Sequence, residues 1–243
     1  MEPVQIDEKV LTGQVKVIKS FLKTDLRHNL ALVPRPFIIE LTGSPGSGKS
    51  LTTQVLYDYF RIKGLRVLIP QEAAEVIQHI SRTTPLYNIR TGLESLTKII
   101  DESSRHNYDI IIFNRAIFDA YCWAQYWFEK GKLSSPDQSN LKTFFINSFF
   151  TSLIDRAYIF VCEAEKAMAR EFRVTISKQG RETTNPNSIA NLVKIFRDSY
   201  SYLHLFHRQL QFIDTTNMTE QEMVDTVAED LINALAKLKI KSP

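Results

Sequence analysis

The spacing of apolar positions changes along the chain between two patterns. Short apolar runs bounded by glycine, proline or charged residues are typical of buried strands. The segments between these runs place apolar side chains three and four residues apart, as in helices that cover a sheet. Strands are expected at 37–42, 66–69, 109–113, 157–161 and 210–213. This alternation predicts an α/β domain built on a parallel sheet.

The helical spacing predicts a helix after nearly every strand. Helices are expected at 6–23, 49–63, 115–130, 141–153, 188–207 and 219–238, with further helical stretches from Glu72 to about 104 that are interrupted at Thr83-Thr84-Pro85. Gly64 closes the second of these helices, because glycine is the usual residue just past a helix end. Thr219 and Glu222 have the spacing of a capping box at the start of the last helix. The helix at 6–23 precedes the sheet and is expected to pack against it.

Composition agrees with one globular domain over residues 1–243, of which 1–35 form a helical N-terminal extension. Hydrophobic residues make up 44% of the chain, which is enough for one sizeable core. The 30 basic and 27 acidic residues leave a formal net charge of +3. Because positive and negative charges nearly balance, the net charge does not support binding of nucleic acid or membrane.

Cysteine content and hydropathy indicate a cytoplasmic protein. Cys122 and Cys162 are too few for a disulfide framework and have no histidine nearby at metal-ligand spacing, so both are interpreted as buried thiols. The first residues lack a basic and apolar secretion signal. Polar residues interrupt the richest apolar run, 144–154, and no membrane span is expected.

A glycine-rich segment follows the first strand and opens the next helix. It matches the pattern GxxxxGK[ST], in which successive backbone N–H groups surround a phosphate and the lysine reaches the terminal phosphates of a nucleotide. The serine hydroxyl at its end is a ligand for Mg²⁺. The residues expected to bind the nucleotide are Gly43, Ser44, Pro45, Gly46, Ser47, Gly48, Lys49, Ser50 and Leu51.

Other features restrict what this loop is used for. The Asn-Lys-x-Asp segment that reads guanine in small GTPases is absent from the sequence. The chain is also short for a motor or a ring-forming ATPase. A small phosphotransferase fits the length and the motif best.

Three more segments follow the loop in a set order. Pro70-Gln71-Glu72 comes directly after the second strand, Asn114-Arg115 ends the third strand, and an arginine-bearing stretch at 163–187 follows the fourth. Over about residues 36–238 this order resembles the P-loop nucleoside and nucleotide kinases. That group includes the thymidylate and deoxynucleoside kinases and related small AAA-like kinase domains. The resemblance implies a three-layer fold, with a five-stranded parallel sheet between helices and a LID segment at 163–187.

The resemblance also implies roles for single residues. Glu72 matches the carboxylate that accepts the proton of the substrate hydroxyl, and Arg115 matches the arginine that contacts phosphate or the reacting hydroxyl. Asn114 stands where the family has a carboxylate that holds Mg²⁺, so with Ser50 it would place the metal without adding charge. Asp119 lies four residues beyond Arg115 on one helix face, where it would orient this arginine or touch a sugar hydroxyl.

In the resembling kinases the arginines of the LID segment close over the phosphates and neutralise charge that develops during transfer. Arg170 and Arg173 are three residues apart and can share one helix face, and Arg181 follows in the loop. We assign Arg170 and Arg173 to catalysis. The alternative is a mobile, solvated segment, because arginine pairs on surface helices are common.

Some residues have two interpretations. Glu72 is either the catalytic carboxylate or a residue that complements the N-terminus of the helix after it. The aromatic residues Phe118, Tyr121, Trp123 and Tyr126 either stack on a base or belong to the core, and only one or two are expected to reach a ligand. Arg82 and Arg90 follow the second strand, where the resembling kinases grip the acceptor; Arg82 is the candidate substrate contact.

The leading hypothesis is an ATP- and Mg²⁺-dependent kinase that transfers the γ-phosphoryl group to a nucleoside, nucleotide or similar small acceptor. One alternative is a nucleotide-sensing module with little turnover, which the neutral Asn114 favours. Another is a kinase that acts on the end of a nucleic acid, which the charge balance neither supports nor excludes. A homodimer is also left open.

Overall fold

The computed structural model describes residues 4–6, 35–105, 107–174 and 185–240. The helix expected over 6–23, with most of the 1–35 extension, lies outside the described residues. Of this extension, Ile6 is buried and belongs to the main hydrophobic core.

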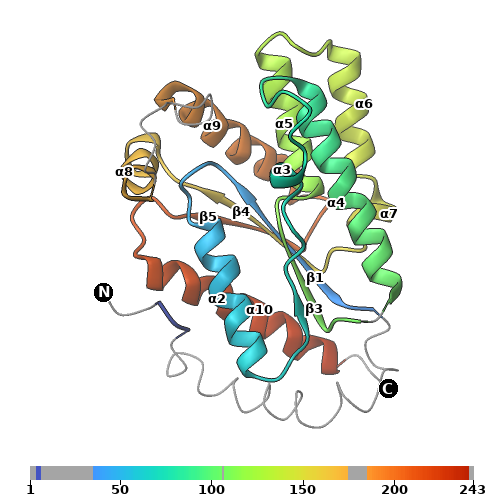
Figure 1. Ribbon diagram of the computed structural model, residues 1–243, viewed down its shortest axis with the longest axis vertical. Helices are drawn as coiled ribbons and strands as arrows, with labels where there is room; N and C mark the ends of the chain where they lie inside the picture. Colours follow the sequence, from blue (N-terminus) through green and yellow to red (C-terminus); the bar gives the residue numbers. More distant parts are fainter. Residues whose placement is uncertain (1–3, 7–34, 106, 175–184, 241–243) are drawn as a thin grey trace.

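The centre of the fold is one parallel five-stranded sheet, as the sequence predicts (Figure 1). Its strands are β1 Phe37–Gly43, β2 Val67–Leu68, β3 Ile110–Asn114, β4 Arg156–Val161 and β5 Leu210–Asp214. The spatial order is β2-β3-β1-β4-β5, so β1 lies in the middle. Strand β1 pairs Leu41 with Asn114 of β3 and with Tyr158 of β4. The carboxyl ends of β1 and β3 therefore meet at one edge of the sheet.

Helices cover both faces of the sheet and make the three layers of the fold (Figure 1). Helices α2 Lys49–Ile62 and α10 Glu220–Ile240 cover one face, and α4 Pro85–Arg105, α5 Ile117–Glu129 and α9 Pro186–Leu203 cover the other. Helix α6 Ser135–Phe145 packs against α5. The short α3 Ala73–Val76 and α7 Ser148–Thr151 and the longer α8 Ala164–Val174 connect these layers. None of the described helices is long and apolar enough to cross a membrane.

Side chains of β1 alternate between the two layers of the core. Ile39 and Leu41 belong to the cluster under α2 and α10, whereas Ile38 belongs to the cluster under α4, α5 and α9. Because successive side chains of a strand point to opposite faces, Glu40 and Thr42 lie on the same face as Ile38. Both are fully buried. Two polar side chains thus point from the central strand toward α5.

Helix boundaries differ from the sequence prediction where polar residues cap helices. The single helix expected at 141–153 is wrong: α6 begins at Ser135 and a separate helix, α7, follows. The Ser134 hydroxyl accepts the Asp137 N–H at 3.2 Å, and the Asn147 side chain accepts the Phe149 N–H at 2.9 Å. Each of these contacts starts a helix, and neither is visible in the apolar spacing.

Other boundaries lie closer to the prediction. Helix α5 starts at Ile117 rather than at 115, because Arg115 has a φ of 71° and cannot be helical. Helix α9 ends at Leu203, not at 207. The capping box is confirmed: Glu222 Oε2 accepts the Thr219 N–H at 2.8 Å, and Thr219 Oγ1 accepts the Glu222 N–H at 3.2 Å. Both cysteines are buried and free, as predicted.

Candidate active site

The glycine-rich loop joins β1 to α2 and is closely packed on the side away from solvent. Gly46 has a φ of 65°, and a Cβ atom there would lie 2.7 Å from the Ala167 carbonyl oxygen of α8. At Gly43 a Cβ atom would lie 1.8 Å from the Phe160 carbonyl oxygen of β4. Both positions need glycine, because any larger residue would overlap backbone atoms. The loop conformation is therefore set by the neighbouring strand and helix as well as by its own sequence.

Lys49 is the first residue of α2, and its ammonium group lies inside the loop. The Nζ atom donates to the Ser44 carbonyl oxygen at 2.6 Å and to Ser47 Oγ at 3.1 Å. Ser44 Oγ in turn accepts the Cys162 N–H at 3.1 Å, which ties the loop to the end of β4. A cation and the N-terminus of a fourteen-residue helix are thus directed at the same small space.

Three side chains converge beside this loop at the end of β3. The Asn114 amide nitrogen donates to the Glu72 carboxylate and lies 3.4 Å from Ser50 Oγ. The Asn114 Oδ1 atom is buried and has no hydrogen-bond partner among the described residues. The Ser50 hydroxyl and the Glu72 carboxylate are oxygen ligands of the kind that Mg²⁺ prefers, and Asn114 turns its amide nitrogen toward both of them.

Glu72 immediately precedes α3, but its carboxylate does not cap that helix. It turns instead to Asn114. Burial raises the pKa of Glu72 above its ordinary value, and the nearby positive charges of Arg115 and Lys49 oppose this rise. The Glu72 carboxylate therefore faces the end of β3 and not the N-terminus of α3.

Arg115 and Asp119 form an ion pair at the start of α5. Arg115 Nη1 lies 3.0 Å from Asp119 Oδ1, and the same oxygen accepts the Thr42 hydroxyl at 2.6 Å. The Arg115 backbone N–H donates to the Leu41 carbonyl oxygen at 2.9 Å, which fixes the residue against the end of β1. Asp119 thus pairs with Arg115, with Thr42 as an additional partner.

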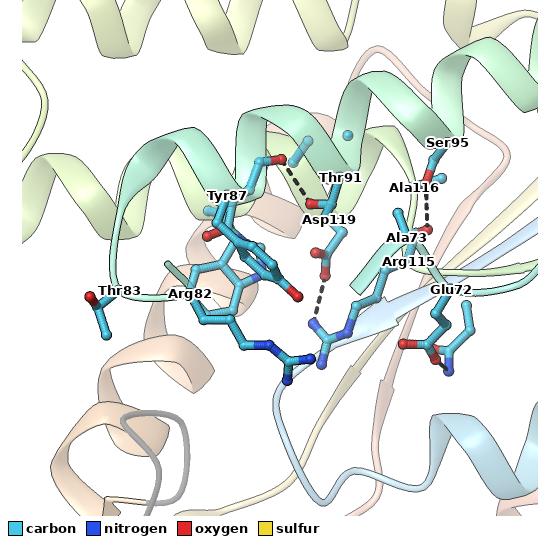
Figure 2. A pocket seen from close by; sticks show the side chains of 15 residues that line it. Glu72, Ala73, Arg82, Thr83, Tyr87, Thr91, Ser95, Arg115, Ala116 and Asp119 are labelled. Atoms are coloured by element: carbon cyan, nitrogen blue, oxygen red, sulfur yellow. Dashed lines mark hydrogen bonds and ion pairs between the residues drawn. The ribbon is translucent and has the colours of Figure 1, made fainter. Parts of the chain in front are cut away.

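These residues line one cavity of 710 Å³ (Figure 2). Its walls come from α4, α5, the end of β3 and the segment around α3. Trp123 and Tyr87 supply aromatic surface, and Arg82 places its guanidinium 5.7 Å from the centre of the Tyr87 ring. The residues that line it are Glu72, Ala73, Arg82, Thr83, Tyr87, Asn88, Thr91, Gly92, Ser95, Asn114, Arg115, Ala116, Asp119, Ala120 and Trp123.

The cavity brings together the predicted substrate contacts Glu72, Arg82, Arg115 and Asp119. Arg90 is not among its lining residues and pairs with Glu94 at 2.7 Å. Of the aromatic residues singled out in the sequence, Trp123 alone lines the cavity. Phe118, Tyr121 and Tyr126 belong to the core.

The arginine-bearing segment is described only in part. Residues 164–174 form helix α8, and Arg170 lies beside the loop rather than in solvent. Its guanidinium donates to the carbonyl oxygens of Thr215 at 2.8 Å and Met218 at 3.2 Å, and it lies 3.5 Å from the Gly46 carbonyl oxygen. The side chain of Arg173 and all of Arg181 lie outside the described residues.

Sequence reasoning missed some residues of the site. Tyr87 and Asn88 of α4 line the cavity, and Asn88 accepts the Trp127 indole N–H at 2.8 Å, but nothing in their spacing marks them. Glu40 does not line the cavity but supports the helix beside it, and it had a visible signal, namely a carboxylate inside a mostly apolar strand. Its oxygen atoms accept three backbone N–H groups at the start of α5.

Three solved structures of deoxyadenosine kinase from M. mycoides superpose on this architecture. The structure with products dCMP and a flexible dCDP bound has a TM-score of 0.59 at 13% identity and covers 81% of this chain and 100% of that chain. The structure with bound dATP has a TM-score of 0.58 at 15% identity, covering 80% and 98%. That with bound dCTP has a TM-score of 0.57 at 14% identity, covering 82% and 100%.

The chain has the fold of a P-loop deoxynucleoside kinase. At this level of identity the likeness establishes the architecture alone. The sequence matches no family model and no curated protein.

Proposed function

We propose that this protein is an ATP- and Mg²⁺-dependent phosphotransferase that moves the γ-phosphoryl group of ATP to a small acceptor of the nucleoside or nucleotide class. One observation carries the proposal: a residue that lines the cavity of 710 Å³ also contacts the phosphate-binding loop. Asn114 lines the cavity and also lies 3.4 Å from Ser50 of the loop. An acceptor in the cavity would face the phosphates of a donor in the loop.

The donor site is the loop from Gly43 to Leu51. Its backbone N–H groups and the N-terminus of α2 favour polyphosphate, and the Lys49 ammonium would exchange its contacts within the loop for the β- and γ-phosphates. Structural neighbours crystallised with dATP and dCTP support a nucleoside triphosphate as the ligand.

The residues present fit a Mg²⁺ ion beside the loop. Ser50 Oγ and the Glu72 carboxylate would hold it, directly or through water. Asn114 would join them once its amide group turned its oxygen toward Ser50, because its nitrogen now faces both groups. When bound there, the metal would neutralise charge on the phosphates during transfer.

The acceptor would lie in the cavity between α4 and α5. Its volume is within the range of about 300–1,000 Å³ that is usual for small-molecule sites. Glu72 would accept the proton of an acceptor hydroxyl as this oxygen attacks the γ-phosphorus and the bond from that phosphorus to the bridging oxygen of ADP breaks. Arg115 and Arg82 would steer the acceptor. For a phosphate acceptor no proton has to be removed, and Glu72 would then only position it.

Arg170 and Arg173 remain candidates for neutralising charge over the phosphates. Arg170 lies beside the loop at Gly46, so a contact with phosphate requires only that its guanidinium exchange some of its carbonyl partners. Charge-assisted bonds from arginine to phosphate are stronger than bonds to neutral carbonyl groups. Ordering of a nucleotide in the loop would favour this exchange.

The neutral Asn114 supports a second candidate, a nucleotide-sensing module with little turnover. A neutral amide in place of a carboxylate lowers the affinity for Mg²⁺. Titration with ATP followed by long single-turnover incubation separates the two candidates. Tight binding with the nucleotide intact supports the module, and formation of ADP together with a phosphorylated acceptor supports the kinase.

The kinase is tested by coupled ADP release over a panel of nucleosides and nucleotides. We expect acceptor-dependent turnover in the wild type and its loss in Lys49→Ala. Lys194→Ala, an exposed lysine of α9, is the matched control and should keep full turnover. The proposal fails if no acceptor stimulates ADP release, or if Lys49→Ala turns over like the wild type.

A further inference from the structure

Glu40 is a fully buried carboxylate in the middle of the central strand. Its exposed fraction is 0%, and its neighbours in the strand, Ile39 and Leu41, are core residues. A buried charge is costly unless hydrogen bonds compensate it. A carboxylate at this position therefore needs hydrogen-bond donors close to its oxygen atoms.

These partners are backbone N–H groups at the start of α5. Glu40 Oε1 accepts the Ala116 and Asp119 N–H groups, each at 3.0 Å, and Oε2 accepts the Phe118 N–H at 3.2 Å. The N-cap residue of α5 is Ala116, which has no side-chain acceptor. A residue of the neighbouring strand thus does what an N-cap side chain normally does: its oxygen atoms accept the N–H groups at the start of the helix.

Thr42 makes a second link from the same face of β1. Its hydroxyl donates at 2.6 Å to Asp119 Oδ1, the oxygen that also accepts Arg115 Nη1 at 3.0 Å. The Arg115 backbone has the unusual φ of 71° and is held by the Leu41 carbonyl oxygen. Consecutive contacts from β1 therefore fix the backbone of Arg115, the helix turn after it and the carboxylate that orients its guanidinium.

We propose that Glu40 and Thr42 are positioning residues that set the place of the Arg115 guanidinium in the acceptor cavity. The inference rests on the proposed function, because Arg115 is the acceptor contact in that reaction. Neither residue lines the cavity, so each acts through another residue. A guanidinium that is held in place before the acceptor arrives needs no reorganisation during the reaction.

Thr42→Val and Glu40→Gln test the proposal, with Thr42→Ser as the conservative variant. Thr42→Val keeps the shape of the side chain and loses the hydroxyl, so kcat/KM for the acceptor should fall on the order of 10- to 100-fold. The KM for ATP should change less than about twofold, since the loop is untouched. Thr42→Ser keeps the hydroxyl and should restore most of the activity.

The decisive comparison repeats these substitutions in an Arg115→Ala background. If Glu40 and Thr42 act through Arg115, neither substitution should lower turnover further there. Tyr158→Phe is the matched control: it removes a buried hydroxyl whose hydrogen bond goes to Asp230 of α10 at 2.6 Å, on the opposite face of the sheet. The proposal would be overturned if the substitutions lowered turnover equally with and without Arg115, or if Tyr158→Phe lowered turnover as much as they do. Either result would indicate a general effect on stability.

A measurement without substrate separates failure of this inference from failure of the proposed function. Hydrogen exchange of the Ala116, Phe118 and Asp119 amides reports the contact with Glu40 directly. In Glu40→Gln we expect these amides to exchange on the order of tenfold faster, while amides of α10 keep their rates. Unchanged exchange overturns the positioning role even if the protein is a kinase. Accelerated exchange supports the contact even if no acceptor is phosphorylated.

Discussion

Asn114 at the end of β3 donates its amide hydrogen to the carboxylate of Glu72, which lies in the segment between β2 and α3. The two residues are 42 positions apart in the sequence and meet because β2 and β3 are adjacent parallel strands. The neutral residue thus stands beside a negative one at the proposed metal position. Glu72 thus supplies the carboxylate that the end of β3 lacks at Asn114.

Asn114→Asp is expected to raise the affinity for Mg²⁺ by about tenfold, because hard cations prefer charged oxygen ligands. Mg²⁺ titration in the presence of a non-hydrolysable ATP analogue measures this change by calorimetry. Asn140→Asp, at an exposed position on α6, is the control for added charge and should leave the affinity unchanged. An unaltered affinity in Asn114→Asp would remove this residue from the metal site.

Glu72→Gln should discriminate between two kinds of acceptor. If the acceptor is a hydroxyl, loss of the base lowers kcat by roughly 10²- to 10⁴-fold. If it is a phosphate, no proton is transferred and kcat should fall far less. Steady-state kinetics with nucleoside and nucleotide acceptors measure both values, and Glu229→Gln, at an exposed position on α10, is the control. Wild-type kinetics with every acceptor would exclude Glu72 from the site.

Glu40 predicts a specific dependence of stability on pH. Burial raises the pKa of Glu40 to about 7 from an ordinary value of 4.5, with backbone hydrogen bonds opposing the rise. The folded state therefore holds the proton more tightly than the unfolded state. The contribution of Glu40 to stability is fully present below about pH 4.5 and is lost as pH rises to about 7.

The raised pKa of Glu40 corresponds to a loss of roughly 3 kcal/mol in the free energy of unfolding as the pH rises through this range. Urea unfolding of wild type and Glu40→Gln between pH 4.5 and 8 measures it. The difference between the two proteins isolates Glu40, because other groups titrate alike in both. Parallel pH profiles would show that Glu40 titrates normally in the folded protein.

Arg170→Ala should destabilise the protein whether or not the arginine takes part in catalysis. Its guanidinium joins α8 to the carbonyl oxygens of Thr215 and Met218 after β5. The loss leaves partly buried carbonyl groups without these donors and should cost about 1–3 kcal/mol in unfolding free energy. Lys166→Ala, at an exposed position on the same helix, should cost less than about 0.5 kcal/mol. Chemical unfolding of both variants measures these losses. If Arg170→Ala were as stable as Lys166→Ala, the contacts of Arg170 would be contradicted.

The strand pattern and the loop motif could be predicted because both depend on neighbouring residues. A buried parallel strand is apolar over its own length, and the phosphate-binding loop is a single run of eight residues from Gly43 to Ser50. Helix starts were harder, as α6 and α7 show, because one polar side chain decides where each of these helices begins.

The sequence by itself determined the alternation of strands and helices, the phosphate-binding loop and the order of the segments around it. The tertiary structure alone decided which side chains meet. The strand order β2-β3-β1-β4-β5 places the ends of β1, β2 and β3 side by side, and this brings Glu72, Asn114 and Arg115 to the wall of one cavity. Glu40 makes the difference clear. As part of the sequence it is a charged residue in an apolar strand, and only the packing of α5 against β1 supplies the N–H groups that stabilise its carboxylate.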